Sequence, residues 1–378
     1  MRALILCGLG LLFGCATVAP SRALVTVPEH QKLGLKPDAI EPWEDGRRTD
    51  GAPGSYEWWY FDAHLDDGST LVIVFFDKPI DGAGGPMDPV VSVQLDRPDG
   101  TKFSTGAHVD VQSFSAAKDA CDVRLGPNRF QGDLKRYTIH LDLPEAKGDL
   151  ELVSEVAPWR PGAGVITFGE HDEKYFAWLP SVPHGQVRGT LTLGDKTMQV
   201  SGTGYHDHNW GNAALPGLIH DWYWGRAHVG DYTIIASYIT AEDRFSGTHF
   251  PILLVTKKGE VLVGDSAHVT FKKEREGIDE LTHKPVSARL EWTFEHEGKR
   301  VRVTFERQRS LLHFPLTQQL PRLARFAAGV IGFDGAYHRF GGDVTVEVFD
   351  GETRVDSQRN SAAVWELMYL GHALPPSR

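Results

Sequence analysis

The densest group of chemically active side chains lies in one stretch, GYHDHNWGN, at positions 204–212. In an extended strand, alternate side chains point to opposite faces. One face then carries two imidazoles and an indole, from His206, His208 and Trp210. The other face carries a phenol, a carboxylate and an amide, from Tyr205, Asp207 and Asn209. The stretch is therefore either a chemical centre or a polar junction between two parts of the fold.

A second stretch, HDWYWGRAH at positions 220–228, repeats this mixture. Its alternation groups one set of side chains on a single face, namely His220, Trp222, Trp224, Arg226 and His228. Asp221 and Tyr223 fall on the opposite face. One rim of the protein can thus hold imidazoles, indoles and a guanidinium.

Three interpretations of these stretches stay open on the residues alone. His206 and His208, with a third histidine such as His220, have a spacing suited to zinc. A histidine tuned by Asp207 or Asp221 would instead serve in acid/base chemistry. In the third interpretation these polar groups satisfy the backbone at a strand crossing. Because the His-x-His spacing is common, we predict no metal and no cofactor.

The stretch SYEWWYFDAHLDDG, from position 55, is a third candidate. Alternation sets Glu57, Trp59 and Phe61 on one face. The other face carries Trp58, Tyr60, Asp62 and His64. A strand this aromatic favours a core wall. Glu57, among tryptophans, is a candidate buried acid with a raised pKa.

The elements that must position these residues are strands. In 287–296 and 301–305, apolar residues alternate with polar ones on either side of a Glu297-Gly298 turn, which is typical of a hairpin. Similar short strands and turns recur, with only brief helices such as one around 321–328. This pattern predicts an all-β fold of antiparallel barrels, and about 320 folded residues favour two domains.

Charge and the amino terminus limit the partners and the location. Fifty acidic and 39 basic residues give a net charge of −11, which argues against nucleic acids and anionic membrane surfaces. The apolar run 3–13 is too short to span a bilayer and is typical of a signal peptide. Leu12–Cys15 resembles the bacterial lipobox, which predicts lipidation of Cys15. The alternative is simple cleavage and release. Cys121 is left without a disulfide partner and is expected to be buried.

Four motifs together resemble the AttH-like family, which includes bacterial carotenoid 1,2-hydratases (hydroxyneurosporene synthases). They are EWWYFDAHLDDG, GYHDHNWGN, DWYWGRA and VWELMYLG, and the resemblance spans residues 56–371. It implies two lipocalin-like (calycin) β-barrels. The expected division is a signal peptide at 1–14, a tether at 15–53, an AttH-like domain at 54–215 and a second lipocalin-like domain at 216–378.

The resemblance also implies an activity. Carotenoid hydratases protonate an isolated double bond, and the match to them is at His208 and Trp210. Tyr238 matches a Tyr-x-Asp motif, but Thr240 stands where the acid is expected. Other relatives are lipoproteins associated with ABC-type export systems, and further relatives catalyse cyclisations.

We therefore predict an envelope lipoprotein that binds an apolar, isoprenoid or lipid-like, molecule and assists an ABC-type export system. It would be anchored to the outer membrane by lipid alone and face the periplasm. A hydratase, an isomerase or cyclase, and a purely structural protein are the alternatives. The expected catalytic residues are His208, Asp207, Tyr238 and Glu57. The expected ligand-binding residues are Trp58, His206, Trp210, Trp222, Trp224 and Arg226. In detail, Asp207 and Asn209 would form the junction, while His208 and Trp210 would line the cavity.

Overall fold

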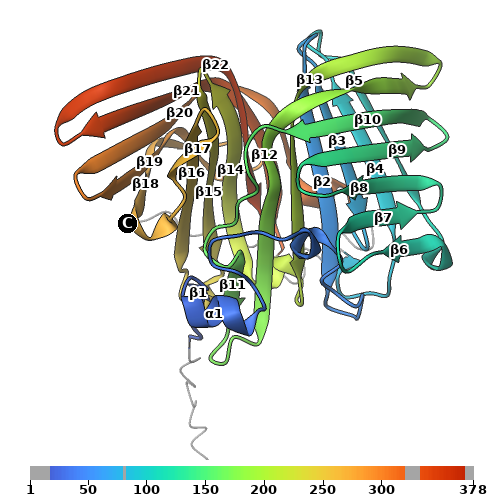
Figure 1. The fold of residues 1–378 in the computed structure, drawn as a ribbon, viewed down its shortest axis with the longest axis horizontal. Coiled ribbons are helices and arrows are strands. Elements are labelled where there is room, and N and C mark those ends of the chain that lie inside the picture. The colour runs from blue at the N-terminus through green and yellow to red at the C-terminus, as the bar shows by residue number, and fades with distance from the viewer. Residues whose placement is uncertain (1–17, 80–81, 320–332, 371–378) are drawn as a thin grey trace, which may run out of the picture.

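The fold consists almost entirely of two antiparallel β-sheets, seen side by side in Figure 1. The computed structural model describes residues 18–79, 82–319 and 333–370. The predicted all-β, lipocalin-like fold class is confirmed. Cys15, with the rest of the expected signal peptide, and the short helix expected around 321–328 lie outside the described residues.

The first sheet contains the strands up to Gly211. Its order is β5-β4-β3-β2-β13-β12-β10-β9-β8-β7-β6, with β11 on β12 and β1 on β11. The strands are β1 (Ser21–Ala23), β2 (Tyr56–Leu65), β3 (Thr70–Phe76), β4 (Val90–Asp96), β5 (Lys102–His108), β6 (Phe114–Ala116), β7 (Cys121–Leu125), β8 (Asn128–Gly132), β9 (Arg136–Asp142), β10 (Ala146–Ser154), β11 (Val165–Phe168), β12 (Lys174–Leu193) and β13 (Lys196–Gly211).

The second sheet begins at Ile219, after the short 3-10 helix η4 (Leu215–Gly217). Its order is β17-β16-β15-β14-β22-β21-β20-β19-β18. The strands are β14 (Ile219–Val229), β15 (Tyr232–Ala241), β16 (His249–Lys257), β17 (Glu260–Val263), β18 (Val269–Ile278), β19 (Pro285–His296), β20 (Lys299–Pro315), β21 (Ala336–Asp350) and β22 (Thr353–Tyr369).

Alternation of apolar and polar residues explains these strands. In β9, for example, every second side chain is buried and the others are exposed. The hairpin expected around Glu297-Gly298 is β19–β20, in which His296 pairs with Lys299. Both turn residues have positive φ, 49° and 75°, as a tight two-residue hairpin requires. This prediction is confirmed.

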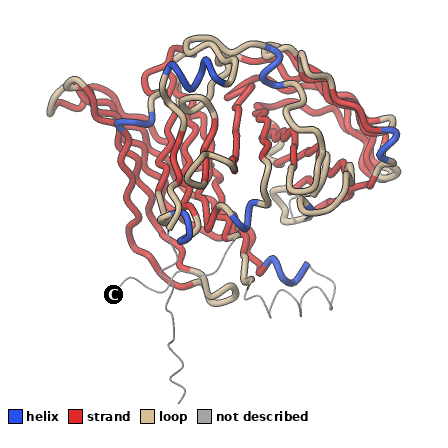
Figure 2. Tube along the Cα trace, turned by 90° about the horizontal axis from the view of Figure 1, so that it is seen from below, coloured by secondary structure: helices blue, strands red, loops and turns tan. Residues whose placement is uncertain are grey.

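Each sheet curls strongly around its own apolar core (Figure 2). Among the described residues, no backbone pairing joins β5 to β6, or β17 to β18. Phe103 and Phe114, near the two edges of the first sheet, instead pack against its core. Side-chain packing, rather than a complete ring of hydrogen bonds, therefore encloses the core.

The segment expected to be a loose tether is folded over its described residues, 18–53. Here β1 pairs with β11, and two short helices follow, α1 (Val27–Lys32) and η1 (Pro42–Asp45). Glu44 and Asp45 at the end of η1 are only 3% and 1% exposed. Arg160 binds Glu44, and Tyr137 donates to Asp45. The sequence did not indicate this folding, because the partners of Glu44 and Asp45, Arg160 and Tyr137, lie far away in the chain.

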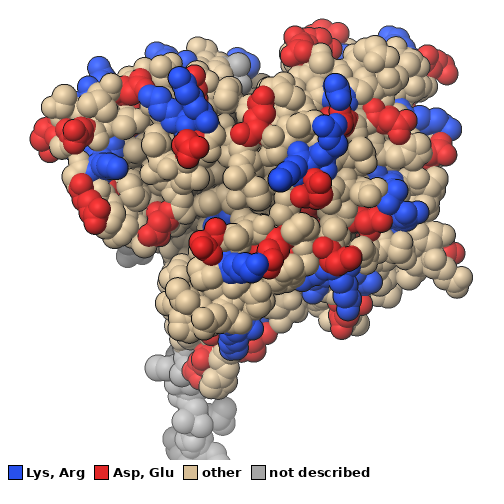
Figure 3. Space-filling model, viewed as in Figure 1, with Lys and Arg blue, Asp and Glu red and all other residues tan. Residues whose placement is uncertain are grey.

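A third apolar cluster lies between the two sheets and holds them together. It draws Trp58, Trp178 and Tyr205 from the first sheet, and Ile235 and Ile239 from the second. On the outside, acidic and basic side chains are interspersed over the face in Figure 3. No helix among the described residues is long and apolar enough to cross a membrane.

Candidate active site between the two sheets

The two faces of β13 meet different surroundings. His206 and His208 pair with Phe61 and Trp59 of β2, whose side chains belong to the core of the first sheet. Asp207 and Asn209 point the other way, toward the second sheet, and line a cavity there. The alternation expected from the sequence is therefore correct, but Asp207 and Asn209, rather than His208 and Trp210, line this cavity.

The cavity between the sheets has a volume of about 110 Å³. Aromatic and apolar side chains from both sheets form most of its wall, together with two carboxyl groups. The lining residues are Trp58, Tyr60, Phe176, Trp178, Asp207, Asn209, Trp222, Trp224, Ser237, Ile239 and Glu366. A cavity walled by aromatic rings, with a few convergent polar groups, is the usual form of a small-molecule site.

Asp207 is the carboxyl group on the side of the first sheet. Trp178 Nε1 and Tyr205 Oη donate to its Oδ2 over 2.8 and 2.7 Å, and Asn209 Nδ2 donates to its Oδ1 over 2.7 Å. Burial raises the pKa of Asp207 to about 6, although the donors Tyr205 and Trp178 lower it. Three donors fix this group in one orientation.

Glu366 is the carboxyl group on the side of the second sheet. Trp222 Nε1 donates to its Oε1 over 3.2 Å, and Tyr337 Oη to its Oε2 over 2.9 Å. Enclosure between the sheets raises the pKa of Glu366. Trp224 is its register partner on β14. The Nε1 of Trp224 has no hydrogen-bond partner among the described residues and can donate to a ligand.

A smaller, more polar space adjoins this cavity and shares Tyr60, Trp224 and Glu366 with it. Its volume is also about 110 Å³. Arg226 lies here rather than in the aromatic cavity, and its Nε donates to Asp62 Oδ1 over 2.7 Å. Both side chains are 6% exposed, so this ion pair joins the two sheets in a buried position.

Three of the expected site residues lie in a different place, inside the first sheet. His208 Nε2 contacts Glu57 Oε1 at 2.7 Å, and His206 Nε2 contacts Asp45 Oδ2 at 3.1 Å. Both histidines and Glu57 are 0% exposed. None of the three lines the cavity between the sheets. Glu57 is a buried acid, as expected, but His206, His208 and Glu57 cannot touch a ligand in that cavity.

Three further residues also differ from expectation. Tyr238 lies inside the second sheet, with its ring stacked on Phe271 at 3.9 Å between centroids, because Tyr238 and Trp222 point to opposite faces. Trp210 stacks on His208 at 4.6 Å and lines a separate space beside η1. His220 contacts Asp221 at 2.6 Å rather than joining His206 and His208.

The cavity therefore combines four expected residues, Trp58, Asp207, Trp222 and Trp224, with several that sequence reasoning missed. The most important of these is Glu366. It stands in the motif VWELMYLG, where Trp365 and Leu367 face the core of the second sheet. An acid between two inward apolar residues must point outward. This signal was present in the sequence, but it does not reveal that the outward face meets the first sheet.

Comparisons with known proteins show which family the chain resembles. Residues 52–290 match the Diels-Alderase-like family. The chain is 26% identical over 230 residues to the quinolone epoxide rearrangement protein asqO of Emericella nidulans, a match covering 55% of this chain and 60% of asqO. It is 29% identical over 216 residues to hydroxyneurosporene dehydrogenase of Chlorobaculum tepidum, covering 46% and 54%. The chain thus spans little more than half the length of these relatives.

Solved structures support the fold. A putative AttH from Nitrosomonas europaea matches with a TM-score of 0.55 and 18% identity, over 92% of this chain and 99% of that chain. The resemblance to AttH-like proteins is therefore confirmed. The matched residues 52–290 make up more than half of the chain and include most of the cavity wall. The protein belongs to the Diels-Alderase-like family.

Proposed function

We propose that the protein is an enzyme that binds an unsaturated apolar molecule between its two sheets and converts it by a ring-forming isomerisation. One observation carries the proposal: aromatic rings from both sheets surround two carboxyl groups in a single cavity. The family and its members named for rearrangements support this class of reaction. The proposed substrate is the apolar ligand expected from the sequence, and the protein would convert it as well as bind it.

A ring-forming isomerisation needs no co-reactant. The O–H bond of a protonated Glu366 breaks as a C–H bond forms at one substrate double bond, which leaves a carbocation. A second double bond of the same molecule attacks the cation, so a C–C bond forms and a new carbocation remains. The C–H bond next to this cation then breaks, its electrons form a double bond, and the proton returns to the Glu366 carboxylate. The faces of Trp58, Trp222 and Trp224 would stabilise the positive charge. A substrate that closes without a cation would use the same walls for positioning and Glu366 as a hydrogen-bond donor.

The size of the cavity limits how a substrate binds. Sites for drug-sized ligands have volumes of about 300–1,000 Å³, whereas this cavity has about 110 Å³. It can enclose only the reacting part of an extended molecule. The rest would occupy the adjoining polar space or require the sheets to move apart.

Hydration of a double bond is a second candidate. It is favoured by the polar space beside Glu366, which is lined by Asp62, Gln94 and Arg339 and suits water. In this reaction water, instead of a second double bond, would attack the cation. The mass of the product separates the two candidates, because isomerisation leaves it unchanged and hydration adds one water molecule.

The test uses purified protein and a panel of linear isoprenoid polyenes, analysed by absorbance and mass spectrometry. Glu366→Gln should reduce turnover by at least about tenfold, as expected for loss of a general acid. Glu260→Gln, at an exposed position of β17, is the matched control and should have full activity. The proposal fails if no polyene binds or reacts, or if Glu366→Gln is as active as the unchanged protein.

The location and the partners of the protein are a separate proposal. We propose that Cys15 carries lipid and anchors the chain to the outer membrane facing the periplasm, and that it assists an ABC-type export system. Support comes from the lipobox-like Leu12–Cys15 and from the family resemblance alone. Cys15→Ser should abolish labelling by a radioactive fatty acid and retention in the membrane fraction. Unchanged retention would refute the anchor.

A further inference from the structure

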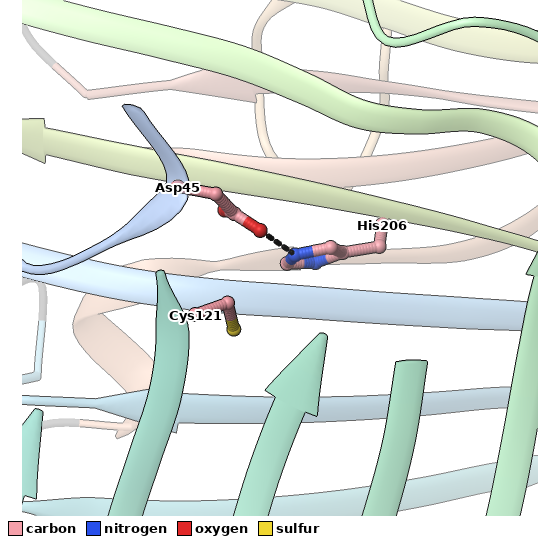
Figure 4. A group of neighbouring side chains, drawn as sticks. All are labelled: Asp45, Cys121 and His206. Atoms are coloured by element: carbon pink, nitrogen blue, oxygen red, sulfur yellow. Dashed lines mark hydrogen bonds and ion pairs between the residues drawn. The ribbon is translucent and has the colours of Figure 1, made fainter. Parts of the chain in front are cut away.

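Three different metal-binding side chains meet inside the first sheet, as Figure 4 shows. Asp45 comes from the end of η1, Cys121 from the start of β7 and His206 from β13. One ligand atom of each lies within 4.8 Å of the others. Their exposures are 1%, 1% and 0%, so the group is shielded from bulk water.

The hydrogen bonds of His206 define which of its nitrogens faces this group. Nδ1 lies 2.8 Å from the carbonyl oxygen of Tyr60. Because a carbonyl can only accept, Nδ1 carries the hydrogen. In the neutral ring Nε2 then holds a lone pair, 3.1 Å from Asp45 Oδ2. A lone pair and a carboxylate oxygen repel each other, so this contact needs either a proton on Nε2 or a metal ion between the two groups.

His208 repeats this arrangement on the same strand. Its Nε2 donates to Glu57 Oε1 over 2.7 Å, so Nδ1 is the free nitrogen of the neutral ring. Nδ1 lies 3.7 Å from Asp45 Oδ1, and neither atom has a hydrogen-bond partner among the described residues. Both side chains are buried, where an unsatisfied polar atom is costly.

We propose that Asp45, Cys121 and His206 bind one zinc ion, and that His208, which lies outside their group, moves closer to complete the coordination. Zinc prefers four nitrogen, oxygen or sulfur ligands in a tetrahedron. Bond lengths of 2.0–2.3 Å give about 3.3–3.6 Å between neighbouring ligand atoms. The separation between His208 Nδ1 and Asp45 Oδ1, 3.7 Å, lies close to this range. His206 Nε2 lies 3.1 Å from the other oxygen of the same carboxylate, Oδ2.

The surroundings of the four residues also fit a zinc ion. Histidine ligands of metals almost always donate their second nitrogen to a carbonyl or carboxylate. Here the Tyr60 carbonyl and Glu57 fill those positions. Tyr137 likewise donates to Asp45 Oδ2, which leaves Oδ1 for the metal. The proposal replaces the expectation from the sequence that no metal is bound.

With four protein ligands, such a site is closed, which is typical of structural rather than catalytic zinc. The ion would link the amino-terminal segment to β7 and β13. Asp207 and Asn209 project from the opposite face of β13 into the cavity between the sheets. The ion would therefore fix the strand that carries them, without touching a substrate.

The first experiment measures metal in the full chain. Elemental analysis of the purified protein should find about one zinc per chain, as a four-ligand site predicts. Because the site is buried, a chelator should remove the metal only after unfolding. Refolding with Zn²⁺ alone should restore a higher melting temperature than refolding with chelator. Refolding with Co²⁺ should give the absorption of a tetrahedral thiolate-ligated ion.

Substitutions then locate the metal. Cys121→Ser and Asp45→Asn should each lower the bound zinc well below one per chain. His313→Gln is the matched control. It lies in a second group, Asp279, His313 and His338, where Asp279 Oδ1 already accepts from Thr282 N and Oγ1, and it should keep its zinc. If Cys121→Ser fails to fold, the zinc content and the Co²⁺ spectrum of the unchanged protein test the proposal. Lack of bound zinc or of a Co²⁺ spectrum after refolding overturns the proposal, as does full zinc in a folded Cys121→Ser variant.

Discussion

Acid should loosen the contact between the two sheets, and His184 is the residue through which we expect this. His184 of β12 stacks on His228 of β14 with 4.2 Å between ring centroids, and its side chain is 4% exposed. The pKa of His184 is lowered to about 3, mainly by burial and also by repulsion from Arg226 and from His228 and His64 when they are protonated. Its Nε2 is 3.4 Å from Glu155, but this carboxylate is 47% exposed, so burial dominates.

The sign and size of the effect follow from proton binding. The ordinary pKa is 6.5, so below that pH the unfolded chain takes up a proton that the folded chain refuses. Stability is full above pH 6.5 and declines as the pH falls toward the folded value. At about pH 5 the difference is about 1.5 pH units, and at 1.36 kcal/mol per unit the loss is about 2 kcal/mol.

The measurement is urea unfolding, followed by tryptophan fluorescence at about pH 7.5 and about pH 5. The comparison variant is His184→Gln, which keeps a polar side chain but cannot titrate in this range. His338, another buried histidine, titrates in both proteins, so its contribution cancels. The unchanged protein should lose about 2 kcal/mol more than the variant on acidification. Equal losses would show that protonation of His184 does not contribute to the loss of stability in acid.

Two other predictions concern residues between the sheets. Asp62→Ala should lower the free energy of unfolding by about 3–5 kcal/mol, because Arg226 is left buried without its partner. Urea unfolding measures this, and a loss below about 1 kcal/mol would contradict it. Trp224→Phe keeps an aromatic wall but removes the unpaired Nε1–H, so it should weaken the binding of a polyene that carries a hydroxyl or carbonyl oxygen about fivefold to tenfold. Fluorescence titration tests this, and unchanged affinity would exclude Trp224 as a donor.

Local patterns identified the strands and their faces correctly. Alternation in 204–210 separated His206 and His208 from Asp207 and Asn209, as observed. Alternation and the turn at Glu297-Gly298 likewise predicted the β19–β20 hairpin. These features depend on residues two to four positions apart, whose geometry in a strand is the same in every protein.

The same patterns did not show what each face of a strand would meet. An imidazole such as His208 is compatible with either a ligand cavity or a buried network. The residue type alone did not distinguish them, and we expected the cavity. The deciding partner is Asp45, 163 positions earlier, in a segment that looked like a tether. Glu366 was missed for a similar reason, since only the packing of β22 beside β14 brings it to Trp222.

The sequence by itself determined the all-β class, the strand faces and the family, because these depend on local alternation and on four ordered motifs. Only the tertiary structure decided that Asp207 and Glu366 share a cavity while His206 and His208 lie inside the first sheet. The physical reason is that a strand with polar groups on both faces can be buried on either side. Which face lines the cavity depends on distant segments, here η1 on one side of β13 and the second sheet on the other.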